Sequence, residues 1–215
     1  RSSVIVNDTF FAADQLSSNT EYTFVVRAIC SPGDTSYAAS VSARTDCGDI
    51  TFLPYIESFE GLPAGTSSNL DCGVPCWGRL DNASSYHFGY IGSPSSWPSG
   101  GHTGTGFLYY YMPTTTGTYA DWIITILPPI DTNTYPLNTL QLSFWVKMNS
   151  TTTTGDIQVG VISNTNDEST FIPLDTVHVA GNVYDLKTAY LTNYVDTANA
   201  THIALKYFRN PSTRS

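Results

Sequence analysis

The sequence predicts an all-β protein with the architecture of an antiparallel β-sandwich. Several segments alternate apolar and polar residues with a period of two, which is typical of strands that bury one face. Gly, Pro, Asn and Ser separate these segments at short intervals, as turns do. No segment keeps a helical period between capping residues. We therefore expect many short strands and no long helix.

The clearest alternation lies between Thr139 and Ile162. The even-numbered residues from Leu140 to Met148 are apolar, so they are expected to point into the core, whereas Trp145 and Lys147 point outward. The pattern resumes after a polar loop, with apolar residues at positions 157, 159 and 161. The two segments are predicted to form a hairpin in the middle of a sheet.

Seven more segments of the same unit have the composition of short strands. They are Leu53–Phe59, Pro75–Leu80, Phe107–Met112, Tyr119–Ile126, Thr170–Val179, Val183–Leu191 and Thr201–Phe208. A change of pattern near Cys47–Ile50 divides the chain into a short unit, residues 1–48, and a larger one, residues 49–215.

Composition narrows the possible functions. Only 13% of the 215 residues are charged, the formal net charge is −9, and Lys and Arg are scattered. A nucleic acid is therefore not an expected partner. No run of about 18 apolar residues occurs, so membrane insertion is not expected either. The sequence contains neither G-x-S-x-G nor H-E-x-x-H, and we expect no enzymatic activity.

The short unit resembles the C-terminal part of a fibronectin type III domain. The resemblance depends on L-x3-T-x-Y at Leu16, Thr20 and Tyr22, on VRAIC ending at Cys30, and on the closing T-x-C at Thr45. It implies that residues 1–48 form a partial β-domain of that family.

The larger unit resembles the MAM-like jelly-roll module of secreted Bacteroidetes surface proteins, of the choice-of-anchor or cleaved-adhesin type, with a galactose-binding-like sandwich. The motifs that carry the resemblance are LPYIESFE at 53–60, PCWGRL at 75–80, LSFWVK at 142–147, VGVISNTNDESTFIPLDTV at 159–177 and HIALKY at 202–207. The resemblance implies a non-catalytic, extracellular or cell-surface module. That family usually continues into another strand, so residues 49–215 are expected to lack the last one.

Four cysteines in a Ser/Thr-rich, Lys-poor chain indicate export and disulfides rather than a zinc site. Because Cys30 and Cys47 each close one of two neighbouring strands, we predict a bond between them. Cys72 and Cys76 are then predicted to pair across a tight turn.

The predicted ligand-binding residues are aromatic and lie in and around the Ser/Pro/Gly-rich loop 93–106. Exposed aromatic rings beside such loops bind sugars and anchor proteins, although the same residues could instead pack the sandwich. The residues are Trp97, His102, Tyr109, Tyr111 and Tyr119.

A second candidate site is a cation site with hard oxygen ligands. Asn164, Asn166, Asp167 and Glu168 lie on one loop and suit a structural Ca²⁺, the one cofactor that the sequence suggests. The alternative is an ordinary turn rich in Asn and Asp.

Together these features predict an adhesion or binding module of a larger surface protein, with an extracellular glycan or protein as its ligand. Neighbouring domains of the same polypeptide are further expected partners, and open sheet edges could allow self-association. Two alternatives remain, an accessory domain of a secreted protease or glycosidase and a structural subunit of a surface filament.

Overall fold

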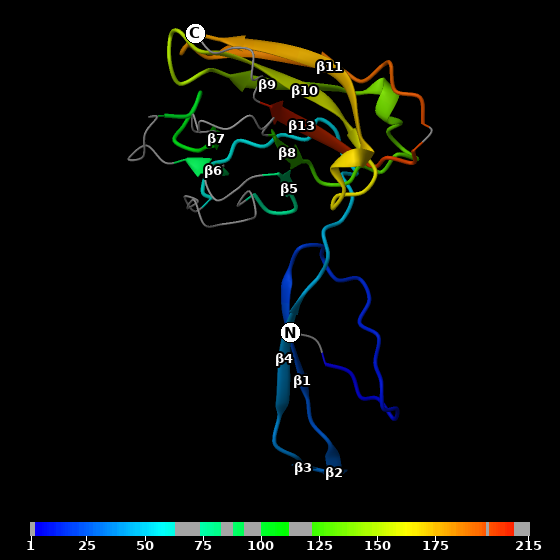
Figure 1. Cartoon of the computed structure of the whole chain (residues 1–215). Helices are drawn as coiled ribbons and strands as arrows, with labels where there is room; N and C mark the ends of the chain where they lie inside the picture. The colour runs from blue at the N-terminus through cyan, green and yellow to red at the C-terminus, as the bar shows by residue number, and fades with distance from the viewer. Residues whose placement is uncertain are drawn as a thin grey trace. The chain divides into compact units, whose positions relative to one another are not determined.

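The computed structural model describes residues 3–62, 74–82, 88–92, 100–111, 122–196 and 198–208, and the side chains of 88–92 and Tyr111 are not included. The chain divides into two compact units, Arg1–Gly48 and Asp49–Ser215, each described by itself (Figure 1). The regular structure is almost all strand, apart from two short 3-10 helices, η1 (Leu137–Thr139) and η2 (Glu168–Thr170).

The first unit is a long antiparallel hairpin. β1 (Glu21–Val26) pairs with β4 (Ala39–Arg44), and β2 (Ile29–Ser31) pairs with β3 (Asp34–Thr35) between them. Residues 3–48 include no buried side chain. Its assignment as part of a fibronectin type III domain stays a prediction.

Five antiparallel strands form the larger sheet of the second unit, in the order β11-β10-β13-β8-β5. Their bounds are Phe171–Ala180, Thr154–Ile162, His202–Phe208, Trp122–Ile126 and Gly78–Asp81, respectively. Neighbouring strands of this sheet are all antiparallel, and the β10–β11 ladder contains a register shift between Val159 and Gly160.

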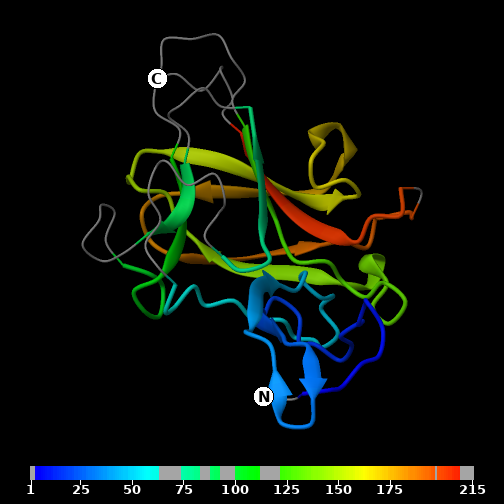
Figure 2. The ribbon, with the colours of Figure 1, turned by 90° about the horizontal axis from the view of Figure 1, so that it is seen from below.

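Two strand pairs complete the second unit. β9 (Gln141–Val146) pairs with β12 (Asp185–Tyr190), and β6 (Phe88–Gly92) pairs with β7 (Phe107–Tyr111). Figure 2 shows β9 and β12 in a layer apart from β10 and β11. The second unit therefore has two layers of antiparallel strands.

The core lies between these layers. Val159 and Val161 of β10 are fully buried, and Leu142 and Phe144 of β9 pack against the same cluster. β9 alternates between exposed and half-buried residues, as its sequence predicts, with the even-numbered residues inward. The predicted all-β antiparallel sandwich is confirmed, whereas its relation to MAM-like modules stays a prediction.

The predicted hairpin between the two central segments is wrong. β9 pairs with β12, and β10 pairs with β11 and β13, so these consecutive strands belong to different sheets. The polar loop between them is long enough to cross from one layer to the other. The alternation gives the facing of each strand correctly but does not determine which strands pair.

Leu53–Phe59 does not form the predicted strand: the segment is irregular, and its Leu53–Pro54 peptide bond is cis. Two of its side chains nevertheless contact Trp77. Phe59 meets Trp77 edge to face at 5.7 Å, and Trp77 Nε1 donates to the Tyr55 hydroxyl at 2.9 Å. Phe59 packs in a small cluster around the buried Val74, whereas Ile56 keeps 78% of its surface exposed.

The predicted Cys30–Cys47 bond is also wrong. Cys47 is bonded to Cys76, which excludes Cys72–Cys76 as well, and Cys30 is free and exposed. The hairpin explains the error, because Cys30 follows the Val26 end of the β1–β4 ladder and Cys47 follows the Arg44 end. In an antiparallel pair these are opposite ends, too far apart for a disulfide. Cys72 lies outside the described residues.

Candidate binding face

An exposed tryptophan is the centre of the candidate site. Trp145 lies on the outward side of β9 and keeps 47% of its surface exposed. The imidazole of His102 stacks on its indole, with ring centroids 3.8 Å apart and planes inclined by 10°. The stack fixes the orientation of a large ring that would otherwise move freely in solvent.

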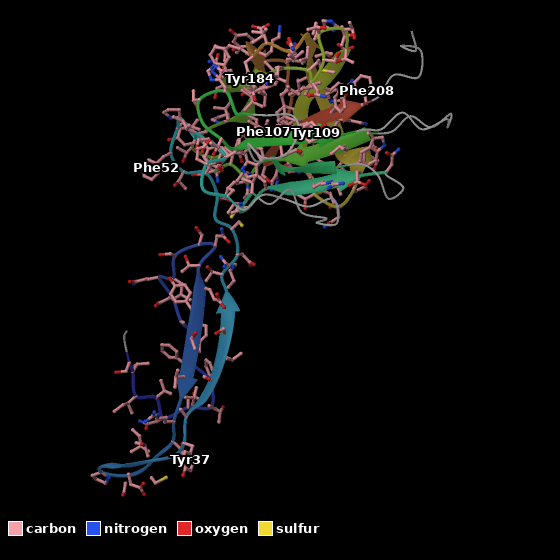
Figure 3. The ribbon with its side chains drawn as sticks, turned by 90° about the vertical axis from the view of Figure 1, so that its left-hand side faces the viewer. Tyr37, Phe52, Phe107, Tyr109, Tyr184 and Phe208 are labelled. Carbon is pink, nitrogen blue, oxygen red and sulfur yellow. The ribbon has the colours of Figure 1, made fainter. Side chains whose placement is uncertain are left out.

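Tyr184 and Lys147 extend this stack. The Tyr184 ring meets His102 edge to face at 5.5 Å, and its hydroxyl donates to the Gly100 carbonyl at 3.0 Å. Lys147 Nζ lies 4.5 Å from the centroid of the Tyr184 ring, a cation–π contact. Partial burial raises the pKa of Tyr184, so its hydroxyl remains a donor at neutral pH. Figure 3 labels Tyr184 among the surrounding side chains.

The loop that carries His102 is held by a carboxylate. Glu60 Oε1 accepts hydrogen bonds from the backbone N–H groups of Thr105 at 2.8 Å and Gly106 at 2.7 Å, and Oε2 accepts from the Thr105 hydroxyl. These bonds lower the pKa of Glu60, the Gly106 N–H most of all. A Cβ at Gly104 would overlap this carboxylate, which explains the glycine.

The stack continues into the surface formed by the outward side chains of β9 and β12. Cross-strand partners share a face, so the register pairs Gln141 with Tyr190, Ser143 with Thr188 and Trp145 with Leu186. We call these six residues the binding face. The Ser143 and Thr188 hydroxyls lie 2.9 Å apart and hydrogen-bond to each other.

The composition of the binding face is chemically specific. None of its six residues is charged, although the whole chain has a net charge of −9. Leu186 and Tyr190 are about as exposed as Trp145, at 49% and 54%. Aromatic rings together with neutral hydroxyl and amide groups are suited to binding a ligand with apolar patches and many hydroxyls.

Two of the five predicted ligand-binding residues have described side chains. His102 is exposed and belongs to the stack. Tyr109 lies in β7 beside Phe107, with which it makes an edge-to-face contact at 6.4 Å (Figure 3). Tyr110 points the other way, and its hydroxyl donates to the buried Thr125 Oγ1 at 2.6 Å.

The other three predicted residues cannot be placed in this way. Tyr111 is described only by its backbone, at the end of β7, and Trp97 and Tyr119 lie outside the described residues. The structure does not bring Tyr109 and His102 together by any contact among the described side chains. A role in binding stays a prediction for all five.

The predicted calcium loop is a compact turn. Asp167 caps η2 by accepting from the Ser169 N–H at 3.0 Å, and Asn164 Oδ1 accepts from the Asn166 N–H at 3.0 Å. Glu168 forms an ion pair with Lys206 at 2.5 Å. These bonds use oxygens that a cation would need, and calcium stays a prediction. No group of three or more His, Cys, Asp or Glu in the described ranges could hold a metal ion.

Three residues that build the site, Trp145, Tyr184 and Glu60, are not among the predicted ligand-binding residues. Trp145 was assigned to the outward face of its strand, and a large apolar residue at an outward position is itself a sign of a binding surface. Tyr184 and Glu60 carry no such sign, because their roles depend on contacts with Gly100, Thr105 and Gly106 across the fold.

Comparisons with known proteins give one similar structure. No family model matches the sequence, and no curated protein matches it either. The K1 cleaved adhesin domain of Lys-gingipain from Porphyromonas gingivalis W83 is similar, with a TM-score of 0.48 and 20% identity over 72% of this chain and 87% of that one. At that TM-score the likeness carries no argument about function. In the described part of the chain, no helix has the length and apolarity of a membrane span.

Proposed function

We propose that the second unit is a non-catalytic binding module of an extracellular or cell-surface protein, and that it holds its ligand on the binding face. The observation that carries this proposal is the exposed Trp145 fixed by the His102 stack. An exposed and oriented aromatic ring contributes strongly to binding because little conformational entropy remains to be lost.

The surroundings of Trp145 support a permanent surface rather than a gap left by loose packing. Its stacking partner is held by the Glu60 carboxylate on one side and by Tyr184 and Gly100 on the other. The bonded Cys47 and Cys76 support an oxidising, extracellular compartment, where disulfides persist.

The test is a paired measurement of binding and stability. The purified chain and its Trp145→Ala variant are applied to arrays of immobilised neutral and sialylated glycans and of immobilised extracellular proteins. We expect binding to at least one class, with Trp145→Ala losing about 1–3 kcal/mol of binding free energy. Tyr37→Ala is the matched control, because Tyr37 is a fully exposed aromatic residue of the first unit.

Two outcomes would count against the proposal. Equal binding by the parent chain and Trp145→Ala would remove Trp145 from the site, and a collapse of the melting temperature would make it a core residue. Trp97→Ala in the same arrays tests the predicted loop site independently.

Self-association is a second candidate, supported by a different region. Val25, Val26 and Val41 of the β1–β4 hairpin are 58%, 69% and 64% exposed, and exposed apolar patches mark interaction sites. Light scattering across a range of concentrations tests it, and a mass that stays monomeric would rule it out.

A further inference from the structure

We propose that the ligand of the binding face is a linear, uncharged oligosaccharide that lies along β9 and β12, with one sugar against Trp145 and another against Tyr190. This inference rests on the proposed function and names the ligand class of the same site. It follows from the spacing, the hydrogen-bonding groups and the charge of the face.

The two aromatic ends are too far apart for one sugar. Trp145 is opposite Leu186, and Tyr190 lies four residues further along β12 on the same face. Four residues of a strand span about 14 Å. A single pyranose ring cannot reach both ends, whereas a chain of a few sugars can contact both at once.

Neutral polar groups occupy the space between the rings. The Ser143 and Thr188 hydroxyls use one hydrogen for their mutual bond, so one O–H hydrogen and several lone pairs remain for a ligand. The exposed amide of Gln141 adds both donors and acceptors beside Tyr190. Sugar hydroxyls also donate and accept, so they match this middle section.

The charge of the face favours an uncharged ligand. None of the six residues is acidic or basic, and Lys147, beside the stack, lies over the Tyr184 ring. A strongly anionic ligand would meet the field of a chain with a net charge of −9. A cationic ligand would find no carboxylate among the six residues, and the neighbouring Asp175 carboxylate already accepts from the Tyr190 N–H at 3.3 Å.

A protein ligand fits the same face less well. Protein hot spots gather near the centre of an interface in desolvated pockets. Here the centre is the Ser143–Thr188 hydroxyl pair, and two of the three large apolar residues, Trp145 and Leu186, lie at one end with Tyr190 at the other.

The experiment measures affinity against chain length. The full chain is titrated calorimetrically with β-1,4-gluco-, α-1,4-gluco-, β-1,3-gluco- and β-1,4-galacto-oligosaccharides, from monosaccharide to hexasaccharide. We expect at least one series to bind, with affinity that rises with length and then levels off. Tyr190→Ala should weaken the hexasaccharide about tenfold, the effect of losing one hot-spot residue. The same variant should weaken the disaccharide less, because a disaccharide cannot contact both rings at once, and Tyr37→Ala should change neither affinity.

The outcomes separate this inference from the proposed function. The inference is overturned if no series binds, if a monosaccharide binds as tightly as a hexasaccharide, or if Tyr190→Ala leaves the hexasaccharide affinity intact. Trp145-dependent capture by an immobilised protein, without any oligosaccharide binding, would overturn the inference and keep the proposed function. Length-dependent binding that survives Trp145→Ala would overturn both. Circular dichroism of each variant confirms that the fold is retained.

Discussion

The outer faces of the two sheets differ in burial. On the five-stranded sheet, Ile124, Ile126, Ile162 and Ala204 form a second buried cluster on the side away from the central core. On the β9–β12 pair, the corresponding side is open to solvent. A strand that is covered on both sides can only contribute to stability, whereas a strand with one open side can also present side chains to a ligand.

The sequences of the strands predict this difference in burial. β8 reads WIITI and buries its four residues after Trp122, while β9 reads QLSFWV and exposes every second residue. Continuous apolar runs are typical of strands buried on both faces, and alternation is typical of strands buried on one. An aromatic residue that breaks the polar half of an alternation, as Trp145 does, then marks a candidate surface.

Truncation of the doubly buried sheet should have the largest effect on stability. Ile124 has no exposed surface, so Ile124→Ala is expected to lower the free energy of unfolding by about 2–5 kcal/mol. Leu186→Ala on the open face should change it by less than about 0.5 kcal/mol. Urea unfolding of both variants measures the contrast, and similar losses would mean that the two faces are equally buried.

Neighbouring positions on β9 give a smaller contrast within one strand. Phe144→Ala is expected to cost about 3 kcal/mol, because this ring packs against the core but is only partly buried. Trp145→Ala should cost about 1 kcal/mol, which is the value of a lost aromatic pair. If the two variants lost equal free energy of unfolding, both faces of β9 would be buried.

A pH effect should distinguish the covered face further. Burial lowers the pKa of His202 below its ordinary 6.5, and the nearby Asp49 carboxylate only partly opposes this. The unfolded chain therefore binds more protons between the lowered pKa and 6.5, so stability should fall as the pH decreases through that window. Melting temperatures at about pH 8 and about pH 5 measure the fall, and His202→Gln should reduce it. An unchanged slope in the variant would assign the effect to another group.

The smallest expected effect concerns the loop at the open face. Hydrogen bonds lower the pKa of Glu60 below its ordinary 4.5. Above that pH the carboxylate is ionised and accepts the hydrogen bonds that fix the His102 loop. The hold is lost as the pH falls through the lowered pKa. NMR can follow this through the His102 ring protons, which the stacked Trp145 shifts upfield. Glu60→Gln should weaken that shift at neutral pH, and an unaltered shift would mean that the loop is held by other contacts.

Local periodicity was enough to predict the sandwich and the facing of β9. It could not give the pairing, because β9 and β10 have strand patterns that suit a hairpin equally well, and only the layer crossing decides. The disulfide prediction was wrong for a similar reason: Cys47 bonds to Cys76, although Cys30 is nearer to it in the sequence.

The candidate site was predictable only in part. The aromatic, Gly-rich surroundings of His102 indicate a site from the sequence alone, and the outward position of Trp145 is a comparable sign. Tyr184 meets them only because the turn before β12 lies against the loop before β7. Contacts of this kind depend on the path of the whole chain, and no local pattern in the sequence encodes them.

The crossing from β9 to β10 also has a consequence for the folding rate. β10 pairs with the next strand, β11, but its other partner, β13, lies far along the chain; β9 likewise pairs with the distant β12, and β8 with β13. Chain entropy must be lost to bring these distant strands together before their hydrogen bonds and apolar contacts can form. The second unit is therefore expected to have a high contact order and to fold slowly. Sandwiches of this kind fold in milliseconds to seconds. The layer change that leaves one side of β9 open also delays the completion of both sheets.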